Sequence, residues 1–234
     1  MNPCNGDVSF DADSFSGVAR LFPLPNLVMY PHVMQPLHIF ESRYREMLED
    51  ALASDRLIAM AILEPGWEPD YEGRPPISSY ACLGKIVAHN RLEDGRYNLL
   101  LMGVGRVRIV EEVSPPRSFR QAKVELLREC CGGTIEQSNE LRADLLAAFK
   151  HLMPCSCQVP EQLAELVSQH MPLDMLTDLA AYTLPLELAV KRELLAECRV
   201  LSRARILLKQ MECLLESNSA AVSLEAFPPR FSMN

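Results

Sequence analysis

Residues 20–48 read RLFPLPNLVMYPHVMQPLHIFESRYREML, and this stretch carries the strongest structural signal in the chain. Its four prolines fix φ and remove amide donors between short apolar runs, so the first part is predicted to be extended and turning. From Phe40 onward the apolar residues follow helical spacing, and Glu41 and Arg45 stand four residues apart, an order that supports a helix. The stretch therefore predicts a proline-broken strand that continues directly into an amphipathic helix.

The residues after this helix are rich in strand signals. Apolar runs at 57–63 and 80–92 predict buried strands, and Asp94-Gly95 predicts a hairpin turn because this pair accommodates positive φ. Further strands are predicted at residues 96–104, 106–113 and 119–127. About six strands with one inserted helix predict a closed or nearly closed barrel.

The hydrophobic period changes after Cys131-Gly132-Gly133-Thr134. Apolar residues then recur at helical spacing, first at 141–152 and later from Leu186 to Glu216. The chain is therefore predicted to have an α+β fold. A six-stranded β-barrel-like subdomain with one inserted helix is expected over residues 19–129, and a C-terminal α-helical bundle over 134–217. Residues 1–18 and 218–234 are expected to be flexible tails.

The composition excludes several classes of protein. The chain has 234 residues, 48% of them hydrophobic, and a formal net charge of −8, so no broad attraction to phosphate is expected. It has neither a secretory signal pattern nor an apolar run near the roughly 20 residues that a membrane helix needs. The eight cysteines are interpreted as reduced thiols. We expect a soluble, cytoplasmic protein.

The opening stretch resembles the start of the substrate-binding domain of Lon-type ATP-dependent proteases. The matching residues are Pro23 to Asn26, Tyr30-Pro31, and Pro36 to Tyr44. The resemblance continues through Cys82 to Val87, Asp94 to Val104, and Leu179 to Glu197. It implies a barrel related to PUA domains followed by a helical bundle. It also implies a module that binds unfolded or exposed polypeptide, or docks on a protease or chaperone partner.

Two positions depart from this family. His32 stands where the family commonly has glycine, so the turn after Tyr30-Pro31 is expected to use a different φ. Arg199 stands where the family often has an aspartate that starts the last helix. The last two helices are therefore expected to run together.

Catalytic and cofactor motifs are weak throughout. A Lon protease needs a P-loop, and Gly84-Lys85 lacks its pattern; the Ser-Lys proteolytic domain would have no room after residue 217. A recognition module without enzymatic activity, cofactor or metal is therefore expected. Gly103-Val104-Gly105-Arg106 begins like a dinucleotide fingerprint, but a bulge or turn explains it better. The set His151, Cys155, Cys157 and His170 has poor spacing for zinc.

The loop at residues 64–79 is the best candidate site. It holds the single tryptophan, Trp67, together with Tyr71, and its four prolines lower the entropy that a partner's binding would cost. The loop and the inserted helix are expected to border one shallow groove. Trp67 either anchors a partner or covers one mouth of the barrel, and both readings stay open. The candidate polypeptide-binding residues are Trp67, Tyr71, Phe40, Tyr44, Arg43, Glu68 and Asp70.

Two alternatives compete with polypeptide recognition. A PUA-like barrel can bind RNA, and the last helices carry basic residues; a solvated face paired with neighbouring glutamates is the favoured reading. These basic residues are Lys191, Arg192, Arg199, Arg203, Arg205 and Lys209. A self-associating regulatory scaffold, for instance a homodimer, is the other alternative. Nucleic acid is the less favoured partner because of the overall negative charge.

Overall fold

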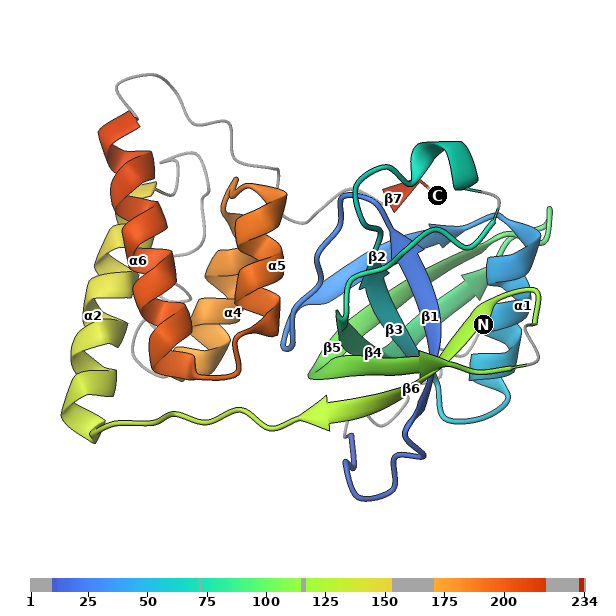
Figure 1. Ribbon diagram of the computed structural model, residues 1–234, viewed down its shortest axis with the longest axis horizontal. Helices are drawn as coiled ribbons and strands as arrows, with labels where there is room; N and C mark the ends of the chain where they lie inside the picture. Colours follow the sequence, from blue (N-terminus) through green and yellow to red (C-terminus); the bar gives the residue numbers. More distant parts are fainter. Residues whose placement is uncertain (1–9, 72, 115–116, 153–170, 218–231, 234) are drawn as a thin grey trace. The chain divides into compact units, whose positions relative to one another are not determined.

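The computed structural model describes residues 10–71, 73–114, 117–152, 171–217 and 232–233 (Figure 1). The chain divides into two units: residues 1–127 with 228–234, and residues 128–227. The first unit holds the strands, and the second holds the long helices.

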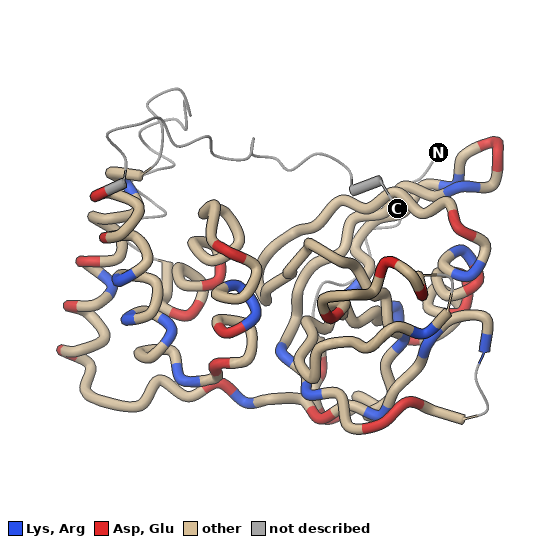
Figure 2. The backbone as a smooth tube through the Cα atoms, turned by 45° about the horizontal axis from the view of Figure 1, so that its top comes forward, with Lys and Arg blue, Asp and Glu red and all other residues tan. Residues whose placement is uncertain are grey.

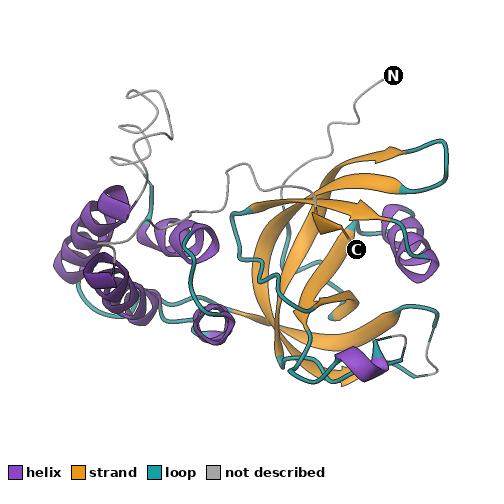
Figure 3. Ribbon diagram, turned by 90° about the horizontal axis from the view of Figure 1, so that it is seen from above, coloured by secondary structure: helices purple, strands orange, loops and turns teal. Residues whose placement is uncertain are grey.

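The strand unit is a barrel. Its strands are β1 (Val18–Leu24), β2 (Met34–Ile39), β3 (Leu57–Ile62), β4 (Tyr80–Arg91), β5 (Tyr97–Glu112), β6 (Arg120–Leu127) and β7 (Ser232–Met233). They follow the order β4-β3-β1-β6-β5-β2-β7, and a further pairing between β4 and β5 closes the ring. Seen from above, the strands curl round on themselves (Figure 3). The predicted six-stranded, barrel-like subdomain is confirmed.

The two strands predicted at 96–104 and 106–113 are one continuous strand, β5. Leu83 aligns with Gly105 and Gly84 with Gly103, so Val104 is an extra residue in a β-bulge. A Cβ atom on Gly103 would lie 2.0 Å from the Tyr30 carbonyl oxygen, which explains why a side chain has no room there. The glycine pair therefore bends the barrel, as the bulge interpretation predicted.

His32 retains the backbone conformation that glycine favours. Its φ is 64°, in the left-handed region. The His32 amide donates to the Gly103 carbonyl, and the Gly103 amide donates to the Val33 carbonyl, both at 2.9 Å. These two bonds hold the turn in place, so the expectation that histidine would change φ is wrong.

The barrel core is filled by inward-facing apolar side chains of β1, β3, β4, β5 and β6. Phe10 and Phe15 pack against this cluster, and their rings meet edge-on at 6.1 Å. The segment predicted as an N-terminal tail thus contacts the barrel from Phe10 on, because two large apolar rings gain from burial. Residues 1–9 lie outside the described part.

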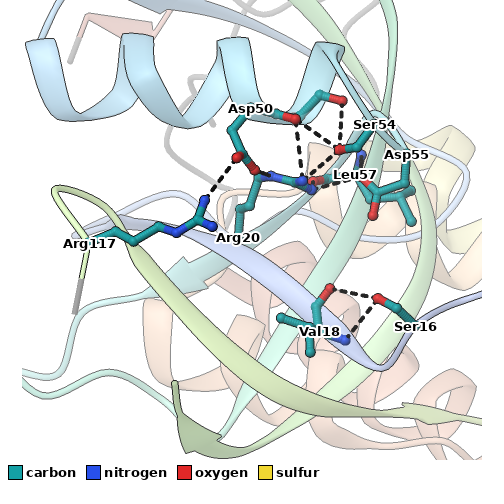
Figure 4. Close-up of polar contacts among 9 residues, drawn as sticks. Ser16, Val18, Arg20, Asp50, Ser54, Asp55, Leu57 and Arg117 are labelled. Atoms are coloured by element: carbon teal, nitrogen blue, oxygen red, sulfur yellow. Dashed lines mark hydrogen bonds and ion pairs between the residues drawn. The ribbon is translucent and has the colours of Figure 1, made fainter. Parts of the chain in front are cut away.

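Helix α1 (Ser42–Leu52) follows β2 and confirms the predicted amphipathic helix. Tyr44, Met47, Leu48 and Ala51 are its buried residues. Arg20 of β1 fixes its C-terminal end: the guanidinium bonds the Asp50 carboxylate at 2.5 Å and the Asp55 carboxylate at 2.7 Å. Figure 4 shows this cluster, in which Arg20 also donates to the Ser54 hydroxyl and to the carbonyls of Asp50 and Leu57.

The second unit is helical in its described residues, as predicted. Its helices are α2 (Ile135–Leu152), α4 (Leu173–Thr183), α5 (Leu188–Ala196) and α6 (Val200–Ser217). Helices α2 and α4 both pack against α6 and against each other, and α5 packs on α4. Leu145, Leu194 and Met211 are among the side chains buried between them.

The prediction that the last two helices run together is wrong. Glu197 is extended and ends α5. The Arg199 amide donates to the Glu197 carboxylate at 2.8 Å, so this carboxylate satisfies an amide at the start of α6 as a capping aspartate would. The Cys130 amide donates to the Cys198 carbonyl and the Val200 amide to the Cys130 carbonyl, which pins the break.

Candidate functional site

The loop predicted to carry the site, residues 64–79, is anchored along its length; we call it the proline loop. Its two ends pair, because the Glu64 amide donates to the Pro76 carbonyl at 2.9 Å and the Ser78 amide to the Ile62 carbonyl at 2.8 Å. The Arg120 guanidinium donates to the Pro75 carbonyl at 2.7 Å. These bonds add to the stiffness that the prolines impose, so the loop presents its side chains on a fixed backbone.

The proline loop contacts the start of α1. The Tyr71 hydroxyl donates to Glu41 Oε1 at 2.7 Å, and Arg43 Nε donates to Glu41 Oε2 at 2.9 Å. The Arg43 guanidinium lies 5.1 Å from the centroid of the Tyr71 ring, a cation–π distance. One carboxylate therefore holds the loop's tyrosine and the helix's arginine together; these three residues form the loop–helix contact.

Burial and the neighbouring carboxylate change the acidity of the tyrosines here. Burial, and then the hydrogen bond to Glu41, raise the pKa of the Tyr71 hydroxyl to about 12. Burial also raises the pKa of the Tyr44 hydroxyl. Both phenols are consequently protonated at neutral pH, and Tyr71 acts as a donor to Glu41.

Trp67 lies at the accessible side of the proline loop. Its side chain is partly exposed, and its ring meets the Tyr71 ring edge-on at 5.4 Å. Glu68 and Asp70 belong to the short 3₁₀ turn η1 (Glu68–Asp70) and are exposed. The loop therefore displays an aromatic pair with two carboxylates beside it.

The two aromatic residues predicted from the helix segment have opposite environments. Tyr44 is only 3% exposed, and its ring packs edge-on against Phe22 at 4.5 Å, so it belongs to the core. Phe40 precedes α1, is 42% exposed, and has the His38 ring 6.3 Å away. Phe40 is accessible to solvent, and Tyr44 is covered.

The hollow between the proline loop and α1 is small. Its volume is about 20 Å³, which suits one water molecule and excludes an amino-acid side chain. Its lining includes Arg43 and Tyr44 from the helix and Tyr71 and Pro75 from the loop. The space between the loop and the helix is therefore too small to admit a side chain of another molecule.

Two residues of this region escaped the sequence analysis. Glu41 joins Tyr71 to Arg43, and Arg120 of β6 holds the loop from the other side. Nothing in the spacing of these residues reveals their contacts with the proline loop, because Glu41 is 30 positions from Tyr71 and Arg120 is 45 positions from Pro75.

Two arginines of the predicted basic face, Arg203 and Arg199, are paired with glutamates. Arg203 is 1% exposed and donates to the Glu129 carboxylate at 2.9 Å and to the Glu197 carbonyl at 3.0 Å. Arg199 pairs with Glu197 at 2.7 Å. Acidic positions also lie beside basic ones through the helical unit (Figure 2). These ion pairs favour a solvated helix face whose arginines pair with glutamates over a phosphate-binding surface.

Within the described ranges no three His, Cys, Asp or Glu side chains are grouped closely enough to hold a metal ion. Of the zinc set weighed in the sequence, Cys155, Cys157 and His170 lie outside these ranges. Among the helices that the structure describes, none combines the length and apolar character needed to cross a bilayer.

Comparison with known proteins identifies a family that the chain resembles. The sequence pattern of the ATP-dependent protease La (LON) substrate-binding domain matches residues 18–212. The Lon protease of Dictyoglomus thermophilum is 28% identical over 187 residues, which cover 80% of this chain and 23% of that protein. Lon protease 2 of Desulfotalea psychrophila is 32% identical over 167 residues, which cover 65% of this chain and 21% of that protein.

Solved structures share the fold. The N-terminal domain of the Mycobacterium avium complex Lon protease superposes with a TM-score of 0.63 at 21% identity, covering 83% of this chain and 98% of that one. A Lon N-terminal domain protein from Xanthomonas campestris gives 0.60 at 20% identity, covering 82% and 97%. The chain spans less than a quarter of the two Lon proteases it matches. It belongs to the family of Lon substrate-binding domains.

Proposed function

We propose that this protein binds exposed segments of unfolded polypeptides, and that the proline loop and Phe40 form its contact surface. The observation that carries the proposal is the partly exposed Trp67–Tyr71 pair on a backbone held by prolines and by Arg120. Membership of the Lon substrate-binding family supports a polypeptide as the ligand.

The chemistry of recognition is noncovalent. Aromatic rings on a rigid loop bury apolar surface with little loss of conformational entropy, which suits them as anchors. Each Å² of apolar surface removed from water contributes about 25 cal/mol before ordering costs. A shallow surface of this kind fits many sequences at about micromolar affinity or weaker. Glu68 and Asp70 beside the rings favour segments that carry Lys or Arg.

The proposal assigns no chemical step and no cofactor to these residues, because the matched family pattern is that of the recognition domain. Docking on a protease or chaperone, homodimer formation and a cytosolic location stay predictions. ATP turnover that co-purifies with the protein would contradict the noncatalytic part of the proposal.

The test uses carboxymethylated lactalbumin, a permanently unfolded protein, as a labelled client in fluorescence anisotropy. Trp67→Ala is expected to weaken binding about tenfold, equivalent to about 1.4 kcal/mol, while the free energy of unfolding changes by less than about 1 kcal/mol. Trp67→Phe, which keeps an aromatic ring, is the matched control and should stay close to the parent.

Two outcomes would count against the proposal. If Trp67→Ala leaves binding unchanged and costs about 3–5 kcal/mol of stability, Trp67 is a core residue. If instead the parent protein binds an RNA oligonucleotide with an affinity that falls steeply with salt, the ligand is a phosphate backbone, because apolar peptide binding lacks that dependence.

A further inference from the structure

Strand β2 (Met34–Ile39) is paired with β5 along its whole length. Among the described strands, its other side is paired only with β7, at two positions, and is otherwise an edge of the sheet. The Val33 carbonyl, just before the strand, accepts from the Gly103 amide of β5 at 2.9 Å. Because backbone groups of successive strand residues point to opposite sides, those of Met34, Pro36 and His38 face the edge. Pro36 lacks an amide, and a proline is tolerated there because no ladder bond to β5 is lost.

The outward face of β2 is mostly apolar along this edge, and its polar member is His38, whose Nδ1 lies 2.7 Å from Asn98 Oδ1. Gln35, Leu37 and Ile39 are buried, and the alternate residues are exposed or partly exposed. Met34 is 51% exposed and Phe40, directly after the strand, is 42% exposed. Between them lie Pro36 and His38. The edge therefore offers backbone partners beside a strip of apolar side chains, the two features of peptide recognition by strand addition.

An extended segment already occupies part of this edge. Strand β7 (Ser232–Met233) pairs in parallel with β2, aligning Ser232 with Leu37 and Met233 with His38 (Figure 1). These two residues belong to a segment that was predicted to be a flexible tail, and they form a strand on the side of β2 that faces away from β5. It covers two positions of a six-residue strand.

We infer that the β2 edge is a binding site for an extended client polypeptide, which adds to the sheet parallel to β2, and that β7 is an intramolecular occupant of the same site. This inference rests on the proposed function, since it specifies how the polypeptide is held. Pro36 adds little to the edge, because it lacks an amide and its carbonyl already accepts from Gln35 Nε2 at 2.9 Å. A client strand can still extend past the two positions that β7 pairs, reach the Met34 backbone groups and contact the Met34 and Phe40 side chains. Phe40 joins the edge to the surface of the proposed function.

The first experiment removes the occupant in the full chain. The double substitution Ser232→Pro and Met233→Pro removes the Ser232 amide, which faces β2 in the observed register, and prevents a one-residue shift that would present the Met233 amide instead. It is expected to tighten binding of carboxymethylated lactalbumin about fivefold, because the edge is no longer shared. Ser232→Ala with Met233→Ala keeps both amides and is the matched control, expected to stay within about twofold of the parent.

The second experiment tests backbone pairing directly. A labelled peptide with the sequence of residues 229–234, PRFSMN, is added to the double-proline variant. It should bind and shift the backbone amide resonances of Met34 and His38. The same peptide with N-methyl groups at its serine and methionine should bind at least about tenfold more weakly, because whichever of these two amides faces β2 can no longer donate.

The outcomes separate the two proposals. If client binding is weakened by Trp67→Ala but unchanged in the double-proline variant, and the N-methylated peptide binds as well as its parent, the edge inference is overturned while the proposed function stands. If no unfolded client binds the parent or any variant, the proposed function itself has failed.

Discussion

Helix α1 is held differently at its two ends. At its C-terminal end Arg20, whose side chain is 9% exposed, bridges two carboxylates. At its N-terminal end Arg43 and Glu41, each with a side chain 19% exposed, join the partly exposed Tyr71. At the first end a buried arginine meets two carboxylates whose side chains are 33% and 35% exposed, and the second end borders an accessible aromatic surface.

The difference between the ends is energetic. Removing the buried Arg20 guanidinium leaves two carboxylates, one hydroxyl and two carbonyls without this donor, which is expected to cost several kcal/mol. Single partly exposed pairs and cation–π contacts contribute about 1 kcal/mol or less. We conclude that the Arg20 end fixes the position of the helix. The Glu41 end orients the proline loop on that frame and leaves Trp67 and Phe40 accessible.

The largest effect is expected from the core residue that lies between these ends. Tyr44→Ala should lower the free energy of unfolding by about 4 kcal/mol, because a buried aromatic side chain is removed. Urea denaturation measures the loss. Phe40→Ala, at an exposed aromatic four residues earlier, is the control and should cost less than about 1 kcal/mol. Equal losses at both positions would contradict the assignment of Tyr44 to the core.

Arg20→Ala is expected to cost about 3 kcal/mol of stability, because Asp50 and Asp55 lose their buried partner. The matched control is Arg117→Ala. Arg117 also bonds Asp50, at 2.8 Å, but its side chain is 54% exposed. That substitution should cost under about 1 kcal/mol. A similar cost for both arginines would show that burial does not set the strength of this cluster.

Tyr71→Phe removes only the hydroxyl that donates to Glu41, and should cost about 1 kcal/mol. The pKa of this hydroxyl is raised to about 12 from 10.0, so its contribution is fully present below about pH 10 and is lost as the pH rises towards 12. Denaturation at several alkaline pH values should show this loss in the parent. A parent and variant with the same alkaline profile would exclude the hydrogen bond.

The smallest effect on stability is expected at acidic pH. Partial burial of Asp50 opposes ionisation, yet the bonds from Arg20 and Arg117 leave the pKa of its carboxyl below 3.8. Its contribution to stability is therefore present above that value and is lost as the pH falls through the lowered pKa. Asp50→Asn should flatten this acid limb in denaturation curves below about pH 4. If the acid limb is unchanged, other carboxylates cause the loss of stability at low pH.

Local sequence was sufficient for much of the fold. Prolines between apolar runs, the change to helical spacing at Phe40 and the Asp94-Gly95 turn predict the elements from β1 to β6, because these signals act over a few residues. The prominence of the proline loop as a candidate site also follows from its composition. Which residues of the proline loop contact a ligand stays a proposal.

The sequence by itself determined the order of strands and helices, the barrel and the family. Tertiary structure alone decided that Tyr44 is covered while Phe40 is open, that Glu41 joins Tyr71 to Arg43, and that α5 and α6 separate where Cys130 pairs beside them. It also seated Phe10 and β7 on the barrel. The physical reason is that periodicity reports which face of an element is apolar, whereas burial and long-range hydrogen bonds depend on which distant segment covers that face.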